Sequence, residues 1–172
     1  TLTVGTLGFC PGGGTPGTTE GATVSAQPAP GCLIPNLPDV FYAFNSGSNT
    51  VIQYNLVLGT MQGRAVQVLT ACDGTEVFCE GDVDTGTFPV TPTTDYILRV
   101  LSVPGFTGTF SVCLQTPPPA APEDECATAI AIGDGTYPFD NTAATGTDIT
   151  SCTFGDTKDV WYRYTASCDG NE

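Results

Sequence analysis

The chain contains an internal repeat, which constrains its fold more than any other feature of the sequence. The segment "PDVFYAF" at residues 38–44 returns 120 residues later as "KDVWYRY" at residues 158–164. In each copy six residues separate a cysteine, Cys32 or Cys152, from the aspartate of the motif. Repetition at a fixed period indicates that one structural unit occurs more than once. Since small domains span roughly 100 to 150 residues, we expect one complete module and part of another.

Strand-like segments follow one another through the first module, with turn residues between them. Within residues 50–59, Ile52, Tyr54, Leu56 and Leu58 fall on one face of an extended chain, and Gln53 and Asn55 fall on the other, which is the period of a half-buried strand. The eight expected strands are 22–26, 40–45, 50–59, 65–71, 75–80, 87–91, 95–102 and 108–115. With no helical period between them, they predict an all-β fold of tandem antiparallel β-sandwich modules, of the jelly-roll or immunoglobulin-like type.

The segment "TPPPAAPEDE" at residues 116–125 interrupts this pattern, because successive prolines favour an extended, semi-rigid linker. It separates a β-sandwich module at 10–115 from residues 126–172, which we expect to form the first part of a second, incomplete module. Residues 1–9 are β-prone and stand outside the first module. We expect them to be either the closing strand of a preceding module or an exchanged strand.

Charge and hydrophobicity exclude two classes of partner. The chain carries 18 acidic and four basic residues, for a net charge of −14. This field repels the phosphate backbone of nucleic acids. Apolar residues make up 40% of the chain, enough for a core, but no apolar run approaches the roughly 20 residues of a spanning helix. We therefore expect a folded protein that binds no nucleic acid and does not insert into a membrane.

The eight cysteines indicate an oxidising, extracellular compartment. They form no CxxC pair, and the chain has no histidine to complete a zinc site. Eight cysteines allow 105 pairings. The expected disulfides are the local bridge Cys72–Cys79, then Cys10–Cys32 and Cys126–Cys152, each of which brackets the same segment of the repeat. Cys113 and Cys168 are left over, and their partners are expected to lie beyond this chain.

Several segments resemble a known kind of module. They are "DECATAIAIGDGTYPFDNTAATG" and "CTFGDTKDVWYRYTA" in the second copy, with "PDVFYAF", "GTEVFC", "TDYILRV" and "GTFSVC" in the first. These resemble the repeated modules of very large secreted and cell-surface proteins of environmental bacteria, and are similar to bacterial pre-peptidase C-terminal domains. The first copy departs from the pattern where "GFCPGGGTPG" replaces the acidic opening. The resemblance implies a small β-sandwich and export, but no activity, because such modules accompany peptidases, adhesins and structural proteins alike.

The repeated motif places aromatic residues on both faces of a strand. Phe41 and Tyr42 in the first copy correspond to Trp161 and Tyr162 in the second, and adjacent residues of a strand face opposite ways. One set is expected to pack in the core. The other set is left with three roles: packing on a sheet edge, packing on the linker, or stacking on a sugar.

The aspartate of the motif, Asp39 or Asp159, allows two readings. In the first, the carboxylate accepts hydrogen bonds from backbone N–H groups of the preceding loop and fixes the entry of the strand. In the second, it binds a ligand. A separate acidic turn, "EGDVDTG", places Glu80, Asp82 and Asp84 at alternate positions. It is read either as a weak calcium site or as a solvated turn.

These features predict a non-enzymatic protein. Histidine, the commonest catalytic base, is absent, as is a GxSxG nucleophile elbow. We expect an extracellular structural or adhesive repeat protein, a subunit or segment of a surface filament or fibre, in which copies of the chain meet through β-strand and module-module contacts. The alternative is an accessory module of a secreted hydrolase that binds carbohydrate or peptide, with glycans as its ligands.

Overall fold

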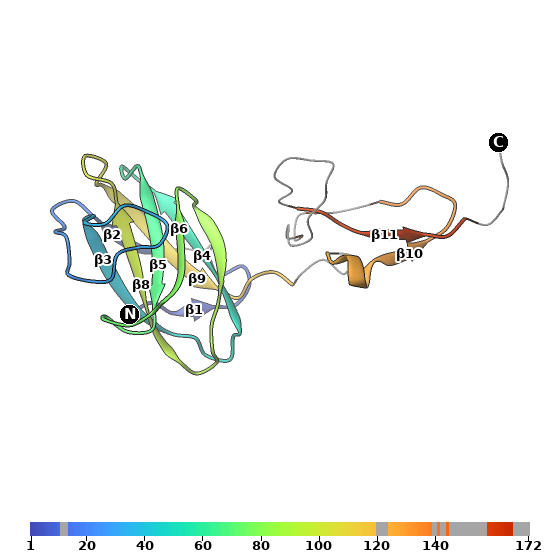
Figure 1. The fold of residues 1–172 in the computed structure, drawn as a ribbon, viewed down its shortest axis with the longest axis horizontal. Coiled ribbons are helices and arrows are strands. Elements are labelled where there is room, and N and C mark those ends of the chain that lie inside the picture. The colour runs from blue at the N-terminus through green and yellow to red at the C-terminus, as the bar shows by residue number, and fades with distance from the viewer. Residues whose placement is uncertain (11–13, 120–123, 139–140, 142–143, 145–157, 167–172) are drawn as a thin grey trace. The chain divides into compact units, whose positions relative to one another are not determined.

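A computed structural model describes residues 1–10, 14–119, 124–138, 141, 144 and 158–166 (Figure 1). The chain divides into two compact units, Thr1–Pro117 and Pro118–Glu172, and each is described by itself. Within the described residues, no helix has both the length and the apolar character needed to cross a membrane.

The first unit is a sandwich of two β-sheets. One sheet has the strand order β1-β9-β4-β7, with β2 also paired to β9, and the other has the order β3-β8-β5-β6 (Figure 1). All pairs are antiparallel except β1 with β9. The strands are β1 (Val4–Gly5), β2 (Thr15–Thr18), β3 (Asp39–Asn45), β4 (Val51–Leu58), β5 (Arg64–Leu69), β6 (Glu76–Gly81), β7 (Thr85–Pro89), β8 (Asp95–Ser102) and β9 (Thr109–Gln115). The predicted all-β, disulfide-stabilised β-sandwich is confirmed.

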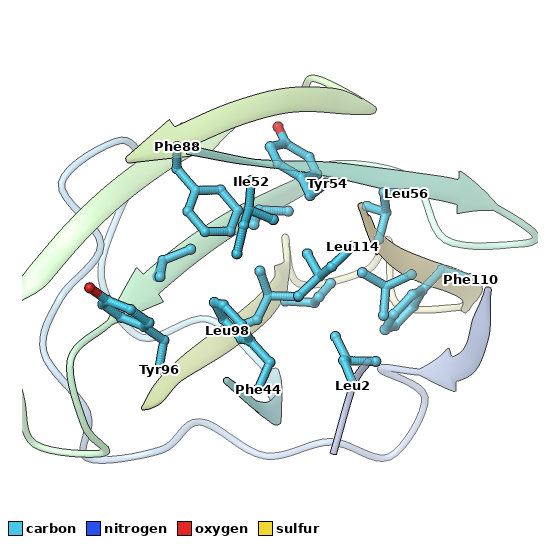
Figure 2. Packing of buried hydrophobic residues seen from close by; sticks show 14 of the residues in the cluster. Leu2, Phe44, Ile52, Tyr54, Leu56, Phe88, Tyr96, Leu98, Phe110 and Leu114 are labelled. Carbon is cyan, nitrogen blue, oxygen red and sulfur yellow. The ribbon is translucent and has the colours of Figure 1, made fainter. Parts of the chain in front are cut away.

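The core lies between the two sheets and follows the period of two. On β4, Ile52, Tyr54 and Leu56 are buried and face the other sheet, while Gln53 and Asn55 between them are only half-buried. Figure 2 shows Ile52 of β4 pointing toward Phe44, Tyr96 and Leu98, which come from β3 and β8. The ring of Phe44 stacks on Tyr96 with a centroid distance of 5.6 Å. The alternation predicted for residues 50–59 therefore places the sandwich core correctly.

Two parts of the first unit differ from expectation. Residues 22–26 form no strand and make only the isolated bridge Val24–Pro38. Residues 1–9, expected to close a preceding module or to be exchanged, lie on their own unit instead: Leu2 is buried in the core and β1 pairs with β9. The β-prone character predicted for residues 1–9 agrees with β1, but β2 was not predicted, because it contains glycine and proline, which are poor strand formers.

The outer face of the β3-β8-β5-β6 sheet is covered by residues 25–37. Leu37 is fully buried against Ala65 and Leu101, which point away from the sandwich core. The disulfide between Cys32 and Cys79 fixes the same segment to the sheet. This sheet is therefore buried on both faces, which explains why β5 and β8 are almost entirely buried.

A buried arginine fastens this covering segment. The Nε and Nη2 atoms of Arg99 contact Asp39 Oδ2 at 2.7 and 2.5 Å. Arg99 Nη1 donates to the backbone oxygen of Pro28 at 2.7 Å and to Gln67 Oε1 at 2.8 Å. Ser25 Oγ donates to the same Asp39 oxygen at 2.6 Å. The carboxylate of Asp39 thus binds a guanidinium and a hydroxyl rather than the backbone donors that we expected, because Arg99 lies on the neighbouring strand β8.

Replacing Asp39 by asparagine is expected to destabilise the first unit by about 3–5 kcal/mol, because it leaves the Arg99 charge buried without its counter-charge. Asp84→Asn is the matched control: it also removes a carboxylate from an arginine pair, but Asp84 is 55% exposed, so at most about 1 kcal/mol is expected. Denaturant unfolding followed by circular dichroism gives both values. Equal losses would contradict the assigned role of the buried pair.

Two disulfides cross the first unit, and both correct the expected pairing. Cys10 is bonded to Cys113 and Cys32 to Cys79, whereas Cys10–Cys32 and Cys72–Cys79 were predicted. Proximity in sequence misled the prediction, since Cys72 lies in the turn between β5 and β6 and is exposed. The third expected pair, Cys126–Cys152, includes Cys152, which lies outside the described residues. Cys168 also lies outside them.

A non-reducing tryptic digest distinguishes the two pairings. Cleavage after the four basic residues gives five fragments, and three of them, 1–64, 65–99 and 100–158, hold every cysteine except Cys168. The observed bonds join fragment 1–64 to both of the others, whereas the pairs expected from the sequence lie within single fragments. After denaturation with free thiols alkylated, mass spectrometry should find all three fragments linked. Separate fragments would refute the observed connectivity.

The described part of the second unit contains a 3-10 turn, Cys126–Thr128, and the two short strands β10 (Ile130–Ile132) and β11 (Tyr162–Tyr164). These strands pair in parallel, with Ile130 opposite Tyr162. β11 is the counterpart of β3 in the repeat, since it carries the second copy of the aromatic motif.

Candidate functional site

A cleft of about 480 Å³ opens at one end of the β3-β8-β5-β6 sheet. It lies where β3 and β5 end and β8 begins, and we call it the end cleft. Its walls come from three segments and the N-terminus. The lining residues are Thr1, Ala43, Phe44, Asn45, Thr70, Ala71, Cys72, Asp95, Tyr96 and Ile97. A cleft of this size matches the volumes typical of small-ligand sites.

The polar groups of the end cleft are held in place before any ligand arrives. Asn45 and Asp95 are opposite residues in the β3/β8 register. The Nδ2 atom of Asn45 donates to Asp95 Oδ1 at 2.7 Å, and the backbone N–H of Gly47 donates to Asn45 Oδ1 at 2.9 Å. On the facing turn, Thr70 Oγ1 accepts a hydrogen bond from the Thr75 N–H at 3.0 Å. Both members of the Asn45–Asp95 pair are exposed to solvent.

The chemistry of this lining suits an uncharged, hydroxyl-bearing ligand. A carboxylate accepts hydrogen bonds from hydroxyl groups, and a carboxamide both donates and accepts. Behind them, the core residues Phe44 and Tyr96, which are buried, close the bottom of the cleft, and Ala43 and Ile97 add aliphatic lining. No lysine or arginine side chain is among the lining residues, all of which lie in the described part of the chain. Sequence reasoning missed this pair, because only the strand register brings Asn45 and Asp95 together.

The aromatic residues of the first repeat copy pack against other side chains of the first unit. Phe44 and Tyr42 pack on the core side of β3. The ring of Tyr42 meets that of Phe110 edge-on, with 6.3 Å between the ring centroids. Phe41 lies on the opposite side of β3, where the guanidinium of Arg99 sits 5.6 Å from its ring centroid. In the second copy, Trp161 Nε1 donates to Asp159 Oδ2 at 3.1 Å.

The acidic turn after β6 is occupied by protein groups, which corrects the calcium expectation. Arg64 Nη2 pairs with Asp84 at 2.6 Å, and Arg64 Nη1 lies 3.9 Å from Asp82. Glu80 Oε2 accepts a hydrogen bond from the Tyr54 hydroxyl at 2.8 Å. No three described aspartates, glutamates or cysteines gather as a metal-binding group. The Arg64 guanidinium therefore lies where the calcium ion was expected, and it neutralises part of the negative charge of the turn.

Tyr54 is held in its neutral form by this arrangement. Burial raises the pKa of its phenol far above the ordinary value of 10.0, and the hydrogen bond to the Glu80 carboxylate raises the pKa further. The phenol therefore keeps its proton in the folded state at a pH where the unfolded chain would lose it.

Above pH 10 the stability of the first unit is expected to fall, because the unfolded state releases the Tyr54 proton and the folded state does not. The contribution of this single group is about 1.4 kcal/mol for each pH unit above its ordinary pKa. Denaturant melts between pH 9 and roughly 12, with free thiols alkylated, should show a steeper decline for the wild type than for Tyr54→Phe. Identical slopes would contradict the assignment.

Comparison with known proteins gives one family. A family model described as galactose binding domain-like and T9SS-associated matches residues 17–114 and 122–172, and each matched segment holds one copy of the aromatic motif. The comparisons with curated proteins and with solved structures find no match. Modules of this kind are non-catalytic binding domains, and T9SS links them to secreted bacterial surface proteins. The T9SS association and the two disulfides together are typical of an extracellular carbohydrate-binding or structural module. Since the matched segments cover most of its length, the chain belongs to the T9SS-associated galactose-binding-domain-like family.

Proposed function

We propose that this chain is an adhesive module of a bacterial cell-surface protein and that it holds a neutral saccharide in the end cleft. The observation that carries the proposal is the exposed Asn45–Asp95 pair in the lining of the end cleft. Such planar polar side chains bind sugar hydroxyl groups, because a carboxylate accepts hydrogen bonds and a carboxamide both donates and accepts them.

Charge narrows the class of saccharide. The end cleft carries the Asp95 carboxylate, and the net charge of the chain is −14. The two arginines of the first unit are engaged elsewhere, Arg99 with Asp39 and Arg64 with Asp84. Acidic glycans, such as uronates and sulfated sugars, would meet an unfavourable field with no compensating guanidinium. The proposed ligand is therefore a saccharide without acidic groups.

Three wider expectations stay predictions. One is the assembly of copies into a filament or fibre. Residues 1–9 pair and pack within their own unit, so we do not propose them as the strand that joins two copies. A role beside a secreted hydrolase, and the closer resemblance to pre-peptidase C-terminal domains, rest on the sequence resemblance alone. Saccharide binding is compatible with either setting.

The test is a glycan array with the intact chain, followed by calorimetry with the best neutral ligand. Asp95→Asn is expected to weaken binding about tenfold or more, since hydrogen bonds to a charged group contribute about 1.5–3 kcal/mol. Asn45→Ala should act in the same direction.

Asp82→Asn is the matched control, because it removes one exposed carboxylate from a different loop. It should leave binding unchanged. Retention of full affinity by Asp95→Asn, or stronger binding of acidic than of neutral glycans, would refute the proposed site.

A further inference from the structure

Three of the four sheet edges in the described part of the first unit are protected against pairing with another chain. One sheet ends in β1 and β2, which are short, and β2 contains Pro16. In the other sheet, β3 already accepts a hydrogen bond from the Leu2 N–H at 2.8 Å, and β6 carries Glu76 and Glu80. Short strands, proline, a covering segment and charged side chains are the devices that keep a strand edge from pairing.

The fourth edge, β7, is open and uncharged. It pairs with β4 on one side, and no strand among the described residues of the first unit pairs with its other side. The exposed side chains of β7 are those of Thr85, Thr87 and Pro89. Asp84, which precedes the strand, is paired with Arg64 at 2.6 Å. In a chain with a net charge of −14, this edge therefore offers a backbone without a charged side chain along it.

Two backbone hydrogen bonds, one at each end of β7, fix the pattern of its pairing with β4. They run from Leu56 N–H to Asp84 O at 2.7 Å and from Val90 N–H to Thr50 O at 2.9 Å. Hydrogen-bonded residues alternate along an antiparallel pair, so Gly86 and Phe88 are the residues of β7 that bond to β4. Thr85 and Thr87 therefore direct their N–H and C=O groups away from β4, toward the open edge.

We propose that two copies of this chain pair through β7, strand to strand and antiparallel, about a two-fold axis at Thr87. The Thr87 N–H of each copy donates to Thr87 O of the other. The Thr85 N–H donates to Pro89 O of the other copy, because proline lacks an N–H but keeps its acceptor. Strand addition at an open edge is a common mode of recognition, and a two-fold contact of this kind is self-complementary.

The strand fits a second copy because it matches itself. With Thr87 opposite Thr87, every exposed side chain of the strand meets an uncharged one, and threonine pairs are favourable across antiparallel strands. Each copy carries a charge of −14, so two copies repel each other, but along β7 no like charges stand directly opposite. A single strand pair is a small contact, so we expect a weak, reversible dimer. Added salt strengthens it by screening the repulsion.

The experiment is sedimentation velocity of the intact chain over a range of concentrations, with free thiols alkylated so that the exposed Cys72 cannot link two copies. A reversible equilibrium between monomer and dimer is expected. Hydrogen exchange followed by NMR then locates the contact. The amides of Thr85 and Thr87 should exchange freely in dilute samples and become protected in concentrated ones.

Thr87→Glu should weaken dimerisation about tenfold or more, because it sets two like charges directly opposite each other. Thr87 is exposed, so the substitution leaves the core of the unit intact. Thr23→Glu is the matched control. It adds the same charge at another exposed threonine, beside β3 in the other sheet, and should leave the dimer unchanged.

A monomer at every concentration overturns the inference. So does a dimer that Thr87→Glu and Thr23→Glu affect equally, or a dimer in which the Thr87 amide gains no protection. No residue of β7 lines the end cleft and no saccharide takes part, so the outcome is independent of the proposed function.

Discussion

The buried ion pair between Asp39 and Arg99 is the interaction on which the architecture of the first unit depends. A guanidinium out of water is stable only when a counter-charge and acceptors surround it, and here those partners come from several segments. They lie on β3, on β5 and in the loop after residue 24. One side chain therefore fixes the order of three adjacent strands and fastens the segment that covers them. With that segment in place, the β3-β8-β5-β6 sheet becomes the interior layer of the unit.

The strands were readable from the sequence because their information is local. Alternation in residues 50–59 and the regular spacing of turns predicted seven of the strands and the sandwich class. The disulfides and the buried ion pair were not readable, because each joins residues that only the strand order brings together. Arg99 does carry sequence information about the ion pair, since it is the one charged residue in the apolar run "YILRVL". A lone charge within a buried strand requires a partner.

The same limit applies to the end cleft. Asn45 and Asp95 both stand next to turns, where such residues are common, and nothing in their local sequence distinguishes them from other turn residues. Their proximity follows from the antiparallel register of β3 and β8, which sets Asn45 against Asp95 at the end of the pairing. By contrast, Glu80, Asp82 and Asp84 formed a conspicuous sequence pattern. Arg64 and Tyr54, which come from other strands, occupy them. Polar clusters in this chain are thus defined by neighbours across the sheet rather than along it.

The connectivity of the disulfides has a mechanical consequence. Cys10 and Cys113 lie 103 residues apart, and the bond between them encloses nearly the whole first unit. A force applied to the two ends of this unit passes through the sulfur atoms and not through the enclosed chain. An extended chain spans roughly 3.3–3.6 Å per residue. Without the bond, unfolding of a segment of this length would therefore lengthen the chain by roughly 350 Å, and the disulfide prevents that extension. Under tension the first unit behaves as a link of nearly constant length, even if its sheets separate.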